Sequence, residues 1–185
     1  MSEQTLKNSI LKRFFLHLHT VNVHRFNVMC NCFACGIYWQ GLTHDLSKYS
    51  PSEFFESVKY FQGFRSPYMY EKEHFGYAPG WLHHKGRNKH HWEYWYDQID
   101  GKWQPLKMPF RYIVEMVCDR VAACKVYQKE NYTQESALNY YKIRNDQYFM
   151  HPETARQLEK ILQAIAIKGE RIVFKELKAV IRSMK

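Results

Sequence analysis

The stretch YIVEMVCDRVAACKVY, residues 112–127, decides the fold that the sequence predicts. It is apolar nearly all round a helix, so we expect it to lie centrally among other helices rather than on the surface. Pro109 stands shortly before it and would open that helix. Asp119 falls in its middle, between Val117 and Val121. An unpaired carboxylate in such surroundings is costly, so Asp119 needs a cation.

Most of the chain outward from this helix also carries helical periodicity, and SPSEF, with Ser50 as N-cap and Pro51 at the first helical position, is a strong start signal. The expected helices cover residues 4–36, 51–63 and 77–85 with a continuation through HHWEYWYDQ, and three more begin at Thr133, at His151-Pro152 and after Gly169. We interpret residues 64–76 as a loop. The turn at Asp100-Gly101 predicts one small hairpin near residues 96–104. The sequence therefore predicts an all-α fold, a single domain over residues 1–185 with six to eight helices.

Composition agrees with one domain, because 185 residues with 45% hydrophobic content are enough for a substantial core. No run approaches the roughly 18 apolar residues of a membrane span, and nothing indicates secretion. The five cysteines form no spaced framework, and three of them crowd into CNCFAC, residues 30–35. On a helix Cys32 and Cys35 share a face that Cys30 does not, which favours small core residues over a metal site. We expect reduced thiols in a cytoplasmic protein without a membrane segment.

The formal net charge is +9, but its lysines and arginines are dispersed. The densest basic run, which contains Lys85, Arg87 and Lys89, is interleaved with histidines. This pattern favours a solvated surface with a local anion site, and a small phosphorylated substrate over a nucleic acid. Arg87 and Asn88 are candidate contacts for a substrate phosphate, the alternative being an exposed turn.

Histidines are numerous, ten in all, and their placement is informative. The notable positions are His24, the adjacent His44-Asp45, the pairs His83-His84 and His90-His91, and the distant Asp119. A lone buried aspartate could be neutralised by Arg120 or another arginine. Imidazoles together with carboxylates are, however, the ligand set of iron, manganese or zinc. A first ion would be held by residues drawn from His24, His44, Asp45 and Asp119, and the two histidine pairs could hold a second.

This order of His, His-Asp and a distant Asp on helices resembles the HD-domain superfamily of metal-dependent phosphohydrolases, and HDLSK, residues 44–48, resembles its His-Asp motif followed by Lys. Residues 90–123 resemble the region of the two-metal HD phosphodiesterases that runs from a His-His pair through an Asp-Gly turn to an apolar helix. More narrowly, WQGLTHDLSKYSP, residues 39–51, and HHKGRNKHHWEYW, residues 83–95, are similar to a family of small bacterial and phage proteins of unassigned function. The likeness covers roughly residues 20 to 155.

The resemblance implies an HD-like helical domain with one or two divalent ions, of iron, manganese, magnesium, nickel or zinc. The implied metal ligands are His24, His44, Asp45, His84, His90, His91 and Asp119. Asp45 would bridge the ions. Neighbouring residues on a helix lie about 100 degrees apart, so either member of each pair, His83 or His84 and His90 or His91, could face the ion. His17 or His19 is an alternative to His24.

The function that the resemblance implies is phosphomonoester or phosphodiester hydrolysis of a nucleotide or another small phosphorylated compound. Asp45 and Lys48 are the candidate catalytic residues, and the substrate contacts would come from Lys48, Arg87 and Asn88. Lys48 could equally well pair with Asp45. The Gly-Tyr-Pro sequence of the cyclic-dinucleotide phosphodiesterases is absent, so the likeness does not extend to that substrate. Two alternatives remain: a di-iron oxygen-activating enzyme, and a non-catalytic, metal-stabilised module that binds a nucleotide or RNA.

Overall fold

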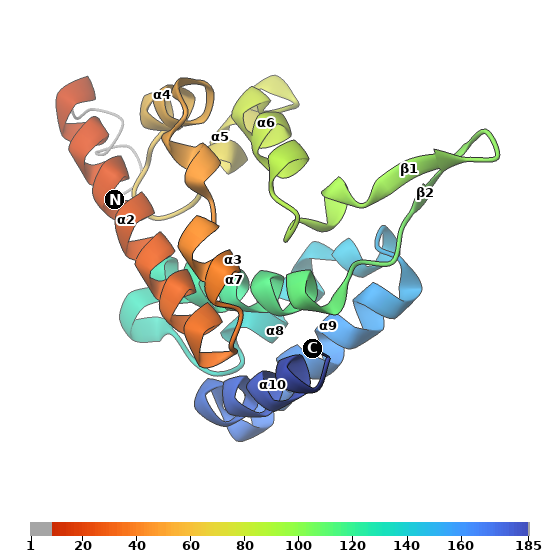
Figure 1. Cartoon of the computed structure of the whole chain (residues 1–185). Helices are drawn as coiled ribbons and strands as arrows, with labels where there is room; N and C mark the ends of the chain where they lie inside the picture. The colour runs from red at the N-terminus through yellow and green to blue at the C-terminus, as the bar shows by residue number, and fades with distance from the viewer. Residues whose placement is uncertain (1–8, 185) are drawn as a thin grey trace.

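The computed structural model describes residues 9–184, which form helices and a single two-stranded hairpin (Figure 1). The α-helices are α2 (Ile10–Ala34), α3 (Tyr38–Thr43), α4 (Pro51–Lys59), α5 (Pro67–Phe75), α6 (Pro79–Arg87), α7 (Phe110–Gln128), α8 (Ser136–Arg144), α9 (Pro152–Lys168) and α10 (Glu170–Ser183). The short 3-10 helices are η1 (Leu46–Tyr49), η2 (Trp92–Tyr94), η3 (Lys129–Asn131) and η4 (Asp146–Tyr148), and the strands are β1 (Tyr96–Ile99) and β2 (Lys102–Pro105). The prediction of an all-α fold is confirmed.

Helix α7 occupies the centre, as its apolar sequence predicts. Its residues Ile113, Val114, Val117 and Val121 are fully buried. It packs against α2 and α9, and α10 lies across α9 and also contacts α2. In Figure 1, α2 and the amphipathic pair α9 and α10 lie on different sides of α7. The core thus fixes α2 against α7, the two helices that carry His24 and Asp119.

A close approach between α2 and α3 brings the residue-44/45 segment to this core. Gly41 of α3 lies directly on α2, where an added Cβ would meet the Cβ of Cys32 at 2.9 Å and the carbonyl oxygen of Met29 at 3.2 Å. Cys32 and Cys35 are buried, with Sγ of Cys35 3.7 Å from Sγ of Cys118 on α7, while Cys30 is exposed. Cys32 and Cys35 are therefore core residues, as predicted, and Cys30 is not. Only a residue without a side chain fits at position 41.

The region between α4 and α7 differs from the sequence prediction. Residues 64–76 are not a loop, because Pro67 opens α5 and Gly76, at φ 79°, ends it. Proline at the first position and glycine just past the end are normal helix boundaries. Helix α4 ends at Lys59 rather than at Gly63, and the predicted continuation through HHWEYWYDQ is wrong: this stretch forms η2 and then β1. The described residues contain nine α-helices rather than six to eight, partly because α5 was not expected.

The predicted hairpin is confirmed. Strands β1 and β2 pair antiparallel with Ile99 opposite Lys102, and the turn residues Asp100 and Gly101 have φ values of 51° and 75°. Positive φ at both turn positions matches the twist of a two-residue hairpin. Figure 1 shows the hairpin extending away from the helices. Trp103 on β2 is 71% exposed.

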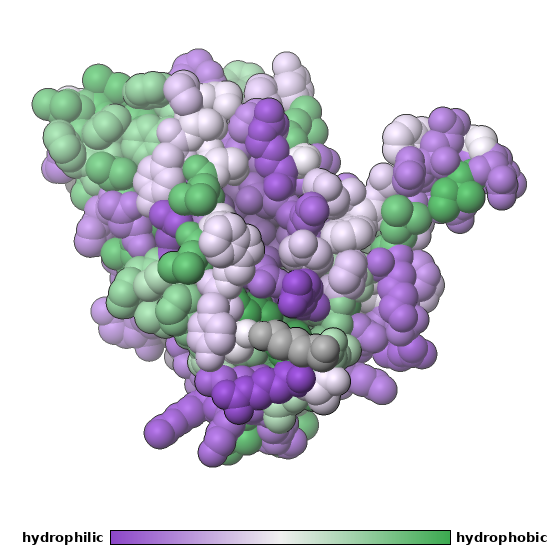
Figure 2. All heavy atoms as spheres, viewed as in Figure 1, coloured by the Kyte–Doolittle hydropathy of each residue, from purple (hydrophilic) through white to green (hydrophobic). Residues whose placement is uncertain are grey.

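Hydrophobic side chains are exposed at the outer end of α2 and on α4, seen as green at the upper left of Figure 2. They include Ile10, Leu11, Phe15 and Phe55. Within residues 9–184, no helix combines the length and the hydropathy needed to cross a bilayer.

Candidate metal centre

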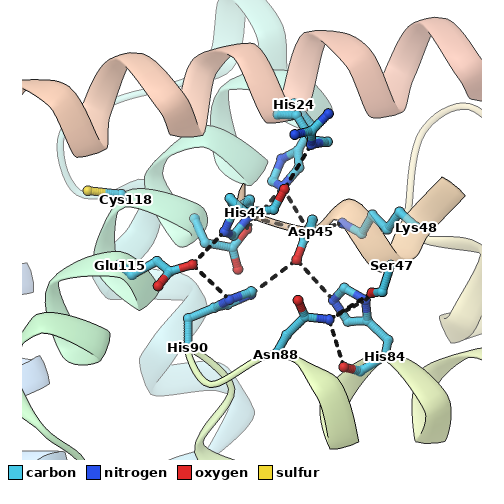
Figure 3. A network of polar contacts seen from close by, with 12 residues as sticks. His24, His44, Asp45, Ser47, Lys48, His84, Asn88, His90, Glu115 and Cys118 are labelled. Atoms are coloured by element: carbon cyan, nitrogen blue, oxygen red, sulfur yellow. Dashed lines mark hydrogen bonds and ion pairs between the residues drawn. The ribbon is translucent and has the colours of Figure 1, made fainter. Parts of the chain in front are cut away.

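Five segments of the chain bring histidine and acidic side chains to one place (Figure 3). His24 comes from α2, His44 and Asp45 from the turn after α3, His84 from α6, His90 and His91 from the segment after α6, and Asp119 from α7. They form two ligand groups. The first ligand group is His24, His44, Asp45 and Asp119; the second ligand group is Asp45, His84, His90 and His91. Within each group the candidate ligand atoms lie within 4.8 Å of one another, which is the spacing that a shared ion requires.

Asp45 belongs to both ligand groups and turns one carboxylate oxygen toward each. Its Oδ2 lies 3.3 Å from Nε2 of His44 and 3.8 Å from Nε2 of His24. Its Oδ1 lies 3.4 Å from Nε2 of His84 and 3.4 Å from Nε2 of His90. This is the arrangement of a carboxylate that could bridge two ions.

The cation that Asp119 needs does not come from Arg120. The guanidinium of Arg120 pairs instead with Asp146, with Nη2 3.1 Å from Oδ2. Asp119 faces the first ligand group, its Oδ1 lying 3.0 Å from Nε2 of His24 and 3.7 Å from Nε2 of His44. The arginine alternative is therefore excluded by the structure.

The atoms that face one another across the two groups have no hydrogen-bond partner although they are buried. They are Nε2 of His24, His44, His90 and His91 and Oδ1 of Asp45, whereas Oδ2 of Asp45 lies 2.6 Å from Nζ of Lys48. Buried polar atoms are nearly always satisfied, so a cluster of unsatisfied nitrogen and oxygen lone pairs directed at the same space needs a ligand. The donor set, imidazole with carboxylate, fits a divalent transition metal. The buried groups could hold a metal ion.

Two buried glutamates hold the histidines from behind. Oε1 of Glu115, on α7, lies 3.0 Å from Nδ1 of His44 and 3.2 Å from Nδ1 of His90, one histidine of each ligand group. Glu53, on α4, accepts from Nδ1 of His84 at 2.8 Å. A carboxylate on Nδ1 fixes the ring and leaves Nε2 as the metal-binding nitrogen, as is usual in protein metal sites.

The protonation states of His84, His91 and Asp45 suit metal binding. Burial, followed by the neighbouring charges of His90 and His84, holds the pKa of His91 well below its ordinary value, and burial also lowers the pKa of His84. Both imidazoles are therefore neutral, the form that coordinates a metal. Burial alone would raise the pKa of Asp45, but the charges of His44 and Lys48 outweigh it and the pKa lies well below its usual range. Asp45 is thus ionised. At His44 the charge of Asp45, acting against burial, raises the pKa well above its ordinary value, so this imidazole must lose a proton before it can coordinate.

The backbone of Asp45 is in the left-handed region, with φ 53° and ψ 27°. Aspartate is one of the few residues that tolerate this conformation. Arg25, next to His24 on α2, holds the turn: its Nε donates to the carbonyl oxygen of His44 at 2.8 Å and its Nη2 to that of Leu42 at 3.2 Å. A single arginine therefore fixes the His-Asp turn relative to the helix that carries the neighbouring ligand.

The predicted phosphate contacts do not all lie together. Lys48 is beside the centre, with Nζ 2.6 Å from Oδ2 of Asp45, which is the pairing that the sequence left open. Asn88 donates to Oγ of Ser47 at 2.9 Å and to the carbonyl oxygen of His84 at 2.8 Å. Arg87 lines a different cavity from Lys48. The structure therefore does not bring Arg87 together with Lys48.

The histidine alternatives are resolved by position. His84 faces Asp45, while Nδ1 of His83 lies 2.5 Å from Oε1 of Glu53. Both His90 and His91 face the second ligand group. His19 is exposed, and His17 is buried against Phe54 and Phe61, with burial lowering its pKa to about 4. His24, and not His17 or His19, therefore belongs to the first ligand group.

An aromatic cleft of about 480 Å³ opens onto the two ligand groups. Its inner end contains His24, Asp45, Lys48, His84, His90, His91 and Asp119. Its walls carry aromatic rings, among them Tyr68, Trp81, Trp92, Tyr127 and Tyr140. The lining also includes Lys72 and the ion-paired group of Arg120, Arg144 and Asp146. The cleft is large enough for a drug-sized organic molecule.

The sequence did not single out the supporting residues Glu115, Glu53 and Arg25. Glu115 did carry a signal, because it lies four residues before Asp119 on the same face of an otherwise apolar helix. Glu53 belongs to the SPSEF start signal and lies in the first turn of α4, where an exposed side chain is usual, yet it is fully buried. Arg25 carried no signal beyond its position next to His24.

Comparison with known proteins adds a family but no activity. No curated protein and no solved structure matches the chain significantly. One family model matches residues 13–164, which include every residue of both ligand groups, and its description gives no function. Because that match covers most of the 185 residues, the chain belongs to the family of unknown function DUF5662.

Proposed function

We propose that this protein is a metal-dependent phosphohydrolase acting on a small organic phosphate, with a nucleotide-like compound as the favoured class. The observation that carries the proposal is Asp45, whose two oxygens face two separate sets of histidines at the closed end of a cleft. Two-metal phosphoester hydrolysis uses such a shared carboxylate. The resemblance to HD-domain phosphohydrolases, drawn from the sequence, points the same way.

The first ligand group would hold one ion and the second ligand group the other, with Asp45 common to both. Divalent metal at such a centre polarises a phosphoryl group and lowers the pKa of a bound water toward about 7. Five imidazoles across the two groups favour iron, manganese, nickel or zinc over magnesium, which prefers oxygen ligands.

The cleft supports the substrate class. Lys48 lines the cleft beside Asp45 and would offset charge on the phosphoryl oxygens, and Lys72, also in the lining, is available to a further anionic group. The rings of Tyr68 and Trp81, with centroids 5.6 Å apart, form an apolar wall beside His84. An aromatic base would find stacking partners there. All five cysteines are free thiols, in keeping with the reducing cytoplasm in which we place this activity.

The test combines metal analysis with a panel of phosphomonoesters and phosphodiesters assayed with manganese, nickel, iron, zinc or magnesium. Asp45→Asn removes the shared carboxylate charge, and we expect it to lose bound metal and turnover together. Asp97→Asn, on the exposed hairpin, is the matched control and should change neither. A protein that holds no metal, or an Asp45→Asn variant as active as wild type, would end the proposal.

One observation also favours a second candidate function, a di-iron oxygen-activating enzyme. The second ligand group offers three imidazoles and one carboxylate, a nitrogen-rich set that iron accepts readily. Iron loading with oxygen consumption and no phosphate release would select it. Salt-sensitive nucleotide or RNA binding without any product would instead select the non-catalytic module.

A further inference from the structure

A second cavity, of about 560 Å³, borders the metal centre but is separate from the aromatic cleft. We name it the basic pocket. It is lined by α3 residues, the segment from Arg87 to His90, and the start of α7, and it shares only His90 with the cleft. We propose that the basic pocket binds a second small organic phosphate, distinct from the molecule held in the aromatic cleft.

Charge is the first argument. Arg87, Lys89 and Arg111 all line the basic pocket, and within residues 9–184 none of them forms an ion pair with a carboxylate. The acidic residue in the lining is Glu115, whose Oε1 already faces Nδ1 of both His44 and His90. Three cations with no counter-charge of their own around one cavity attract a multiply charged anion. Figure 2 has the same view as Figure 1 and shows hydrophilic residues near the ends of α3 and α6, which border the basic pocket.

The second argument is the rest of the lining, which suits an organic group rather than a bare inorganic ion. Tyr38, Trp39 and Tyr112 border the basic pocket, and Trp39 is 74% exposed, so its ring is available for stacking. Gln40 is only 9% exposed, and its Nε2 is buried without a hydrogen-bond partner. Because Gln40 lines the cavity, a ligand oxygen there could accept a hydrogen bond from its Nε2.

The third argument is separation from the cleft. His44 and Glu115 line the basic pocket but not the aromatic cleft, while Asp45 and Asp119 line the cleft but not the basic pocket. A phosphate among Arg87, Lys89 and Arg111 would therefore lie behind the histidines rather than over the open side of the centre. Arg87 would therefore contact the ligand of the basic pocket, and Lys48 would contact the molecule in the aromatic cleft.

Photolabelling with 8-azidoadenosine 5′-monophosphate, followed by residue-level mass spectrometry, tests the inference on the full chain. We expect labelling at Tyr38, Trp39 or Tyr112. Arg87→Gln/Arg111→Gln should reduce that labelling at least 10-fold. Arg156→Gln/Arg171→Gln removes the same charge from exposed positions on α9 and α10 and should label as wild type does. Pyrophosphate in excess should suppress the labelling, whereas adenosine at the same concentration should not.

Three results would overturn the inference: labelling confined to residues of the aromatic cleft, equal labelling of the Arg87→Gln/Arg111→Gln variant, or suppression by adenosine as strong as by pyrophosphate. The measurement is the position of the label and does not depend on product formation. A protein that labels at the basic pocket but hydrolyses no phosphoester would therefore remove the proposed function and leave this second site standing.

Discussion

Nζ of Lys48 lies 2.6 Å from Oδ2 of Asp45, so the lysine occupies the carboxylate oxygen that belongs to the first ligand group. The charge of Asp45, acting against burial, holds the pKa of Lys48 above its ordinary value, and the ammonium stays charged. A cation in this place competes with metal for one oxygen and, once metal is bound, is free to turn to a substrate oxygen. Replacement of Lys48 should therefore lower turnover without loss of metal, whereas replacement of Asp45 should remove both.

For Lys48→Gln we expect turnover to fall on the order of 100-fold, because a charged donor to the phosphoryl group is lost. Metal content should stay at the wild-type level, since lysine is not a ligand. Activity assays beside metal analysis make the measurement, with the exposed Lys59→Gln as control. Loss of metal as complete as in Asp45→Asn would contradict this role.

Glu115→Gln should weaken metal binding by about 10- to 100-fold, as loss of the partner of a ligating histidine commonly does. The reason is that Glu115 orients His44 and His90 together, so its change affects both ligand groups. Chelator competition gives the affinity and circular dichroism verifies the fold. Glu130→Gln, exposed in η3, is the control, and equal metal affinity in the two variants would show that Glu115 does not orient these rings.

Gly41→Ala should destabilise the protein by about 1–3 kcal/mol, the usual result of overpacking a close contact. The new Cβ would lie 2.9 Å from the Cβ of Cys32, so α3 must move away from α2 and take His44 with it. Gly86→Ala is the matched control, because its Cβ would meet nothing within 4 Å. Chemical denaturation should show Gly86→Ala as neutral or slightly stabilised; equal stability of both variants would disprove the close contact.

Glu71 is 1% exposed, and neither carboxylate oxygen has a hydrogen-bond partner. Burial, with the charge of Glu56 adding to it, raises its pKa from 4.5 to about 7. The folded protein therefore binds this proton more tightly than the unfolded chain, and stability is lost as pH rises from 4.5 through 7.

Glu71→Gln removes that ionisation and should stabilise the protein at pH 8 by about 1–3 kcal/mol. The gain should be small at pH 4.5, where the glutamate is protonated in both states. Thermal unfolding across this pH range provides the measurement, with the exposed Glu130→Gln in η3 as control. A gain that does not change with pH would mean that Glu71 titrates normally.

The helical fold was predictable because its strongest signals were local. The apolar stretch of α7, the Ser50-Pro51 start of α4 and the Asp100-Gly101 turn each carry their structure in a few residues. Helix α5 was not predicted because proline and glycine are typical of loops, whereas here Pro67 begins a nine-residue helix and Gly76 follows its last residue. Proline and glycine mark turns as well as helix ends. Only the length of this segment and its packing against the rest of the fold distinguish a helix from a loop.

The ligand residues could be named from the sequence, but their pairing could not. Which of His83 and His84 faces Asp45 depends on how α6 rotates against α4, where Glu53 contacts both. The separation of Arg87 from Lys48 depends on the path of the segment between α6 and η2. Glu115 was overlooked because its role exists only once His44 and His90 have converged on it from distant parts of the chain.

Two properties restrict which residue can occupy position 45: the left-handed backbone and the need for a charged side chain. Its torsion angles admit glycine, asparagine and aspartate with little strain, while the chemistry around it requires a negatively charged oxygen for each ligand group. Of the twenty amino acids only aspartate meets both conditions, and glutamate, although it carries the same charge, would strain the turn. A sequence that follows the same path but carries another residue here would keep the helices and lose the shared carboxylate, so this one position is a simple marker for chains that retain both ligand groups.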